Sequence, residues 1–243
     1  MKLDTAKTLV ASMILFVGLS GPALSDDAAP VVVELFTSQG CSSCPPAEAF
    51  LNELVDRDDL VTLEYHVDYW DYIGWADPYA ESDFTDRQRR YAAKLGSRYV
   101  YTPQMVIDGA AHEVGSDRSA VMALIEQSRS LRNNRPAIDI AHTGGSTHSV
   151  DLSISGPTLV EPYEIILVTY DSSHETEVKR GENRGKILEN RNVVRSMTRL
   201  GEWRGGEFVK TVDLGGLAGD GGCAVLVQRA GNGPILAAAK VGF

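Results

Sequence analysis

The chain of 243 residues has little cysteine and no excess of positive charge. Its 33 acidic residues outnumber its 23 Lys and Arg residues, and the formal net charge is −10 at pH 7. Binding to DNA or RNA through phosphates needs a basic surface, so we expect no nucleic-acid partner. Three cysteines are too few for a fold built on disulfide bonds, which leaves their positions as the informative feature.

Long apolar runs and the common nucleotide and hydrolase motifs are also lacking. There is no Gly-x-Ser-x-Gly, no phosphate-binding Walker loop and no dinucleotide fingerprint. The apolar run from Leu9 to Leu19 has about 11 residues, fewer than the ~20 that span a bilayer. It follows Lys2 and Lys7 and ends before Ala23-Leu24-Ser25. This pattern predicts a signal peptide over residues 1–25, export, and no membrane span after cleavage.

Segments of strand and helix character alternate from residue 30 to 135. Val31–Phe36 is rich in β-branched residues and predicts a buried strand. Apolar residues at helical spacing follow, and Pro45-Pro46 place the helix start at or near the cysteines. The order β-α-β-α-β-β-α is completed by a strand over Leu60–Val67, a helix over Ser82–Leu95, strands over Gln104–Ile107 and Ala111–Val114 around the turn Asp108-Gly109, and a helix around Val121–Leu131 capped by Ser116 or Asp117.

The second half, residues 136–243, has a different pattern. About eight short alternating segments are separated by Gly, Asn and Pro, which predicts an all-β, sandwich-like domain. These segments are Ala137–Ala141, Ser149–Ser155, Tyr163–Thr169, Glu175–Lys179, Val193–Leu200, Phe208–Leu214, Cys223–Gln228 and Ile235–Val241.

Cys41 and Cys44 form a Cys-x-x-Cys at the predicted helix start. Free N–H groups and the helix dipole stabilise an anion there, so the first sulfur can be a good nucleophile. Cys44 lies one turn further on and is placed to close a disulfide with Cys41. Cys41 is therefore the expected attacking sulfur and Cys44 the resolving sulfur.

The strand, the Cys-x-x-Cys, the helix and then Thr102-Pro103 before a strand resemble the thioredoxin fold. The resemblance implies that Pro103 is cis, lies beside Cys41, and that backbone next to it, at Thr102, pairs with substrate. The sequence departs from thioredoxin in having Ser-Ser between the cysteines and no Trp before Cys41.

Longer stretches resemble the secreted family known as DUF1223. They are Val33–Pro46, His66–Asp71, Tyr101–Met105, Gly181–Gly185 and Asn192–Arg195. The resemblance covers most of the chain after residue 25 and implies a thioredoxin-like fold and a redox-like motif. Together with the signal peptide it points to the bacterial periplasm.

Glu34 is a candidate proton acceptor for the second thiol. Thioredoxins carry a buried acid six residues before the first cysteine, whereas Glu34 lies seven before Cys41. A bulge would restore the register and allow proton transfer. Without one, alternation turns the side chain away, and Glu34 is a hydrogen-bonded or surface acid.

Other chemistry-bearing residues have alternative interpretations. Trp70, in the aromatic segment Asp68–Tyr79, either walls a substrate groove or packs in the core. His66 with Asp68 could contribute to a copper or zinc site, but a lone strand histidine is usually structural, and we expect no metal ligands. Cys223 is expected to be a buried, inert thiol. Arg87, Arg89, Arg90 and Lys94 are expected on a solvated helix face.

These observations favour an exported thiol–disulfide oxidoreductase-like protein that acts on a protein or small thiol or disulfide substrate and requires no cofactor. Two alternatives remain. One is a partner-binding module in which the Cys41–Cys44 disulfide is structural, and the other is a copper-handling protein.

Overall fold

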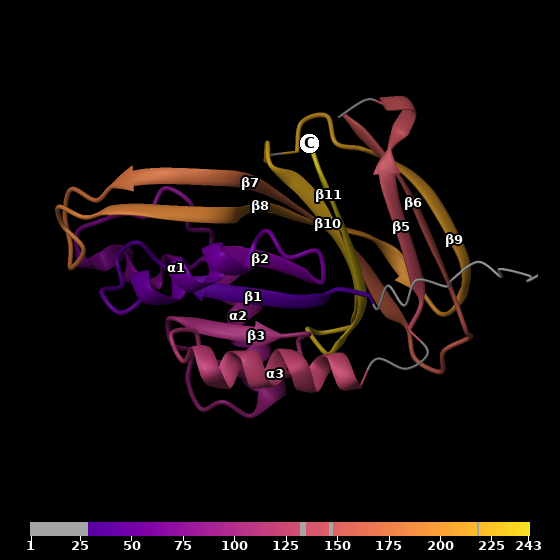
Figure 1. The fold of residues 1–243 in the computed structure, drawn as a ribbon, viewed down its shortest axis with the longest axis horizontal. Helices are drawn as coiled ribbons and strands as arrows, with labels where there is room; N and C mark the ends of the chain where they lie inside the picture. Colours follow the sequence, from indigo (N-terminus) through magenta and orange to yellow (C-terminus); the bar gives the residue numbers. More distant parts are fainter. Residues whose placement is uncertain (1–28, 132–134, 146–147, 218) are drawn as a thin grey trace, which may run out of the picture.

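A computed structural model describes residues 29–131, 135–145, 148–217 and 219–243 (Figure 1). The predicted signal peptide, residues 1–25, lies outside these ranges. Within them, no helix has the length and apolar character needed to cross a membrane.

The first half has the predicted order of elements. Asp117 caps the last helix through its side chain, which accepts a hydrogen bond from the Ala120 N–H at 3.1 Å. A short 3₁₀ helix, η1, occupies the aromatic segment. The elements are β1 (Val31–Thr37), α1 (Pro45–Leu54), β2 (Leu60–His66), η1 (Asp68–Ile73), α2 (Ser82–Leu95), β3 (Gln104–Ile107), β4 (Ala111–Val114) and α3 (Arg118–Ser130).

Alternation along β1 explains why helices cover both faces of the sheet. Val33 and Leu35 pack in the apolar cluster that includes residues of α1 and α3. Val32 and Phe36 point to the other face, toward the cluster that includes residues of α2. Both faces of the strand are buried, as expected for a strand between two helical layers.

The second half is built of strands within the described residues, apart from a short 3₁₀ helix, η2 (Thr143–Gly145). A long hairpin joins two of its strands, β7 and β8. The predicted separate strand over Glu175–Lys179 is wrong, because β7 continues without a break through Glu177. The strands are β5 (Ala137–His142), β6 (Ser149–Gly156), β7 (Tyr163–Glu177), β8 (Ile187–Trp203), β9 (Gly206–Asp213), β10 (Gly222–Arg229) and β11 (Ile235–Gly242).

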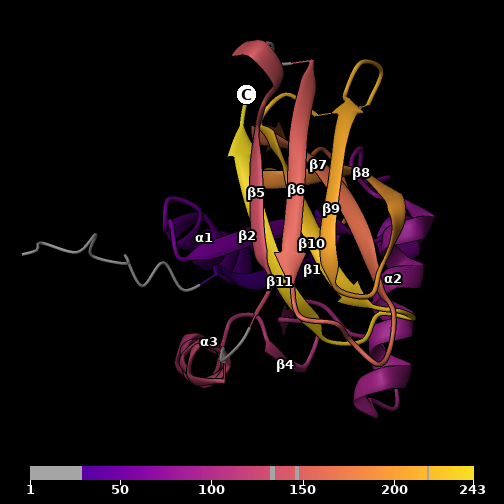
Figure 2. The same cartoon turned by 90° about the vertical axis from the view of Figure 1, so that its right-hand side faces the viewer.

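Strands of both halves form one eight-stranded mixed sheet in the order β11-β10-β7-β8-β2-β1-β3-β4. The halves meet where β2 pairs parallel to β8 at Glu64 and Val193. A second, three-stranded antiparallel sheet, β5-β6-β9, packs against β7 and β10 through a third apolar cluster (Figure 2). The protein is thus a mixed α/β structure, with an eight-stranded mixed sheet and a three-stranded antiparallel sheet, and four strands of the second half extend the sheet of the first.

Arg87 corrects the expectation of a solvated face on α2. Its side chain is buried, and Nε donates to Glu34 Oε1 at 2.7 Å. The hydroxyl of Tyr91, one turn further on, also donates to Glu34. Arg87 further donates to Gln228 Oε1 on β10 at 3.0 Å. A buried guanidinium requires such partners, and these tie α2 to strands from both halves.

Candidate functional site

The cysteine pair lies in the turn that leads from β1 into α1. Cys41 and Cys44 form a disulfide with Cα atoms 5.5 Å apart. The Cys41 N–H donates to Ser38 O at 3.0 Å and the Cys44 N–H donates to Cys41 O at 3.2 Å. Cys44 is the N-cap residue of α1, so the pair stands at the helix N-terminus as predicted.

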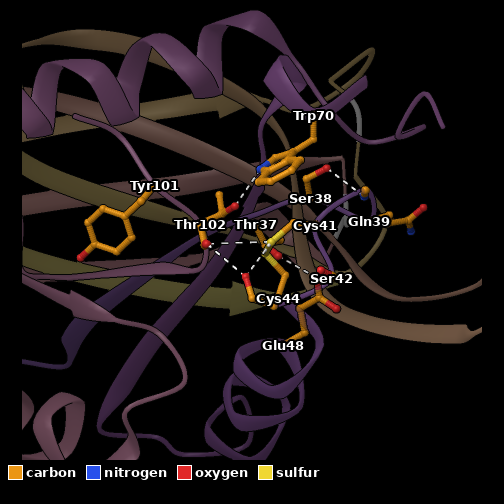
Figure 3. The surroundings of a disulfide bond; sticks show 12 residues. Thr37, Ser38, Gln39, Cys41, Ser42, Cys44, Glu48, Trp70, Tyr101 and Thr102 are labelled. Carbon is orange, nitrogen blue, oxygen red and sulfur yellow. Dashed lines mark hydrogen bonds between the residues drawn. A yellow bond between two sulfur atoms is a disulfide. The ribbon is translucent and has the colours of Figure 1, made fainter. Parts of the chain in front are cut away.

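The Thr102–Pro103 loop lies against the first sulfur. The Thr102–Pro103 peptide bond is cis, which confirms that expectation. The Cys41 sulfur is 3.9 Å from the carbonyl oxygen of Thr102. Ser43 Oγ lies 3.2 Å from the same sulfur and donates to that carbonyl at 3.4 Å (Figure 3). The structure therefore brings the predicted residues Cys41, Thr102 and Pro103 together.

Trp70 joins this group from η1. Its indole N–H donates to Thr102 Oγ1 at 2.8 Å, and the ring lies beside the disulfide in Figure 3. A Cβ atom at Gly40 would lie 3.2 Å from Trp70 Cβ, so glycine permits this close approach. Tyr72, by contrast, points to solvent and is 82% exposed. Trp70 is half-buried and contacts both the cysteine turn and the proline loop.

The tip of the β7–β8 hairpin, residues 178–186, completes the site from the second half of the chain. The Asn183 side-chain NH2 donates to the carbonyl oxygens of Gln39 and Cys41, each at 2.9 Å. Glu182 Oε2 accepts a hydrogen bond from the Ser42 N–H at 3.1 Å. Sequence reasoning assigned no role to Glu182 or Asn183, although both lie in a stretch, Gly181–Gly185, that carried the family resemblance.

A buried polar cluster lies on the α1 face of the sheet, next to the cysteine turn. Glu48 of α1 accepts a hydrogen bond from Thr37 Oγ1 at 2.6 Å. His66 Nδ1 lies 2.8 Å from Asp77 Oδ2, and its Nε2 lies 3.7 Å from Glu64 Oε1. Asp77 also accepts from the Gln39 N–H at 2.7 Å, which links the cluster to the turn before Cys41.

The second half supplies a partner to this cluster. The side chain of Asn190 on β8 donates to Glu64 Oε1 at 2.8 Å. The Arg191 N–H donates to Glu64 Oε2 at 3.1 Å. Both oxygens of this buried carboxyl group are therefore satisfied by β8.

Burial and mutual charge shift the pKa values in this polar cluster. Burial raises the pKa of Glu48 to about 6 and that of Glu64 to about 8. Burial alone would lower the pKa of His66, but the nearby carboxyl groups of Asp77, Glu64 and Glu48 outweigh it and raise that pKa to about 9. The pKa of Asp77 is lowered because the charge of His66 outweighs the burial of the carboxyl group. Around neutral pH, His66 and Asp77 therefore form a charged pair.

Glu34 lies elsewhere. It alternates with Val33 and Leu35 and shares a sheet face with Val32 and Phe36, which contact the α2 cluster. Its carboxyl group is occupied by Arg87 and Tyr91. This arrangement matches the interpretation of Glu34 as a hydrogen-bonded buried acid. Glu48 is a buried acid on the cysteine side of the sheet, and its spacing of four residues from Cys44 was the signal that could have found it.

The remaining candidates are placed apart from the disulfide. Asp68 Oδ1 accepts from Thr85 Oγ1 at 2.6 Å, so Asp68 and His66 have different partners. In the ranges that the structure describes, no group of three or more His, Cys, Asp and Glu side chains is arranged to hold a metal ion. Cys223 is a buried free thiol, as predicted, and burial raises its pKa to about 12.

The fold and site define an α/β protein with a Cys-x-x-Cys disulfide at a helix N-terminus, covered by a hairpin of an attached β region. The chain belongs to the family described as "Protein of unknown function (DUF1223)", whose model matches residues 32–228. A crystal structure of a protein from Agrobacterium tumefaciens, a structural genomics target, is similar with 30% sequence identity and a TM-score of 0.76. The match covers 88% of this chain and 94% of that one. Comparison with curated proteins found no match.

Proposed function

We propose that the protein carries out thiol–disulfide exchange through Cys41 and Cys44 and that its first half is thioredoxin-like. One observation carries the proposal. The Cys41 sulfur lies 3.9 Å from the carbonyl oxygen of Thr102, and Thr102 belongs to the loop that contains cis Pro103. A substrate chain lying along this loop would have backbone partners next to the reacting sulfur. Export to the bacterial periplasm remains the proposed setting, and a protein or small thiol or disulfide compound is the proposed substrate.

The reaction balances without a cofactor. In the reduced protein, the Cys41 thiolate attacks a substrate disulfide, a mixed disulfide forms, and one substrate sulfur leaves as a thiolate that takes a proton. The Cys44 thiolate then attacks Cys41 Sγ, the protein disulfide forms, and the second substrate sulfur leaves. Two electrons pass from the protein dithiol to the substrate disulfide. The same steps in reverse oxidise a substrate dithiol.

Glu48 is the group that supports proton removal from Cys44. It is on the same helix, one turn after Cys44, and its backbone N–H donates to the Cys44 carbonyl oxygen at 3.2 Å. The carboxyl group is buried and its pKa is raised to about 6, which suits a proton acceptor near neutral pH. Glu48, and not Glu34, is therefore the proposed acid of the exchange reaction.

Access to the pair requires motion of what covers it. The residues Cys41 and Cys44 both have 0% exposed surface. We propose that the cover includes Trp70 and the hairpin tip, which hydrogen bonds hold against the proline loop and the cysteine turn. Displacing either one would open a path to Cys41.

The proposal is tested by measuring exchange between the reduced protein and a model disulfide substrate. We expect turnover that Cys41→Ser abolishes, and a Cys44→Ser variant that accumulates a mixed disulfide at Cys41. Cys223→Ser, which changes only the buried thiol, serves as the control and should exchange normally. A reduction potential below about −300 mV together with no exchange would identify a structural disulfide and end the proposal.

The burial of both cysteines favours a second candidate, a partner-binding module with a structural disulfide. In that case the disulfide holds the turn between β1 and α1, and the surrounding surface binds the partner. A double Cys41→Ser, Cys44→Ser variant that keeps the cellular phenotype of the unaltered protein would support this candidate over the exchange reaction.

A further inference from the structure

An acidic side chain from the hairpin tip binds the cysteine turn just before α1, at the residue that follows Cys41. The Glu182 carboxylate accepts the Ser42 N–H at 3.1 Å, and Ser42 directly follows Cys41. This contact bridges 140 residues of sequence. Asn183, the next residue, fixes the tip by its bonds to the carbonyl groups of Gln39 and Cys41. Glu182 is thus held beside the pair by a buried neighbour.

A Glu182 carboxylate and a Cys41 thiolate would repel each other. Cys44 is the N-cap residue of α1, so the Ser42 N–H that Glu182 binds lies in the turn before the helix, on the residue that follows Cys41. A like charge held nearby disfavours the ionised form of a thiol. The disulfide is uncharged and is not repelled. The contact is therefore more favourable with the oxidised pair than with the reduced, ionised one.

We infer that Glu182 is a positioning residue that stabilises the Cys41–Cys44 disulfide over the dithiol, and that a thiolate on Cys41 in turn loosens the hairpin tip. The two effects are thermodynamically linked: if the Glu182 contact stabilises the disulfide, then formation of the disulfide must stabilise the contact by the same free energy. This inference rests on the proposed exchange function and adds how the second half of the chain regulates it.

The elements next to the cysteine turn carry other charged groups, of which some favour and others disfavour a thiolate on Cys41. Glu48 of α1 adds negative charge from the buried side. The hairpin tip also carries cations, Lys179, Arg180, Arg184 and Lys186, of which Lys186 Nζ donates to Asn183 Oδ1 at 2.8 Å. These cations favour the thiolate, and η1 and the proline loop present the uncharged side chains of Trp70 and Thr102. The hydrogen bonds from Ser42 lower the pKa of Glu182, so its carboxyl group is charged at neutral pH.

The test is the redox equilibrium of Glu182→Gln with dithiothreitol. Glutamine keeps a hydrogen-bond acceptor for Ser42 and removes the charge. At a pH above the pKa of Cys41, where the reduced protein carries the thiolate, we expect the equilibrium to move about threefold toward the reduced form, which is about 14 mV at 29.6 mV per tenfold. Glu175→Gln makes the same charge change on an exposed residue of β7 outside the tip and should leave the equilibrium unchanged. Equal equilibria in the unaltered protein and Glu182→Gln would overturn the inference.

A second measurement does not depend on reducing the disulfide. In a Cys44→Ser background, Cys41 is a free thiol, and thiolate absorbance in the ultraviolet gives its acid dissociation constant. Glu182→Gln should raise that constant about threefold, while Glu175→Gln should not. Cys223 does not interfere, because its pKa is raised to about 12. An acid dissociation constant that stays the same or falls contradicts the proposed repulsion between Glu182 and the thiolate.

Hydrogen exchange tests the reciprocal effect. The Gly185 N–H, which donates to Val178 O at 2.8 Å across the hairpin tip, should exchange faster in the reduced protein than in the oxidised one. The difference should shrink in Glu182→Gln, and equal exchange in both redox states would refute the loosening of the tip. A protein that equilibrates with dithiothreitol but does not exchange with substrate disulfides would refute the proposed function alone, since the shift between variants can still be read.

Discussion

Glu48 and Glu34 are both buried acids near one strand, and their surroundings give them different properties. Glu34 has a guanidinium partner in Arg87. Glu48 has a hydroxyl partner in Thr37, and the nearby Asp77 adds to the effect of burial in raising its pKa. A carboxyl group with a neutral donor and little solvent around it is readily protonated. The partner of Glu48 therefore suits this residue to accept and release a proton.

The raised pKa of Glu48 makes stability depend on pH. The neutral form is favoured in the folded state, so its contribution is fully present below the unfolded pKa of about 4.5 and is lost as pH rises through about 6. We expect Glu48→Gln, which keeps the acceptor for Thr37, to be more stable than the unaltered protein by about 2 kcal/mol at pH 7. The two proteins should be nearly equal at pH 4.

Urea unfolding of both proteins between pH 4 and pH 7 measures this difference. Glu53→Gln, which changes an exposed acid on the same helix, is the control and should show no comparable gain above pH 6. Parallel pH profiles for Glu48→Gln and the unaltered protein would contradict the assigned protonation.

For single residues, the sequence predicts which side chains are functional better than it predicts which side chains they contact. Cys41, Cys44, Thr102 and Pro103 were found because their order along the chain carries the information. Arg87 was misplaced because its partner Glu34 lies 53 residues away, and helical periodicity treats an arginine as a solvent-facing residue. Trp70 was ambiguous for the same reason, since nothing local predicts its bond to Thr102.

The β7–β8 hairpin is the element that the sequence describes least well. Polar residues at the end of β7 broke the apolar alternation, and the strand was divided into two segments. The end of β7 is exposed to solvent beyond the apolar core, so its hydrogen bonds to β8 hold it rather than buried side chains. Helix α2 and strands β3 and β4 were predicted with their observed bounds because each has a buried face or a turn signal.

Asn183 should control access to the disulfide. Asn183→Ala removes three side-chain hydrogen bonds and leaves two carbonyl groups with one partner fewer, which we expect to destabilise the closed hairpin tip by about 2 kcal/mol. Local opening would then be roughly 30-fold more frequent, and reduction by dithiothreitol correspondingly faster. The rate of reduction in native buffer is the measurement.

Arg184→Ala is the matched control for this variant. Arg184 is the next residue of the tip, and its side chain is exposed. Its loss should leave the reduction rate close to that of the unaltered protein. If both variants are reduced at the same rate as that protein, the hairpin tip is not the cover that limits access.

On the scale of the whole molecule, the two halves share a core. The apolar cluster beneath α2 combines Leu63 and Tyr65 of β2 with Val168 of β7 and Leu226 of β10. The boundary near residue 135 was predicted from a change in sequence pattern, and it stays a prediction about domains. The alternation of apolar and polar residues indicates which face of a strand is buried. It does not indicate that β2 pairs with β8, because this pairing joins strands far apart in the sequence.

The shared core predicts that a fragment of residues 29–135 does not unfold cooperatively. Without the second half, the edge of β2 and part of the α2 cluster face water, and Glu64 loses its partners on β8. Calorimetry should show one transition for the chain after residue 25 and none for the fragment. Mixing the fragment with residues 136–243 should restore the transition. A fragment that melts cooperatively by itself would show that the first half folds independently.

The distance in sequence between the cysteines and their cover has a consequence for biosynthesis. The hydrogen bond from Asn183 to Cys41 joins residues 142 positions apart. A ribosome makes the chain from its N-terminus, so Cys41 and Cys44 leave the ribosome long before the hairpin tip exists. During that interval the hairpin tip does not yet cover the two thiols. Formation of the Cys41–Cys44 disulfide and docking of Asn183 on the cysteine turn are therefore separate steps in the formation of the folded protein.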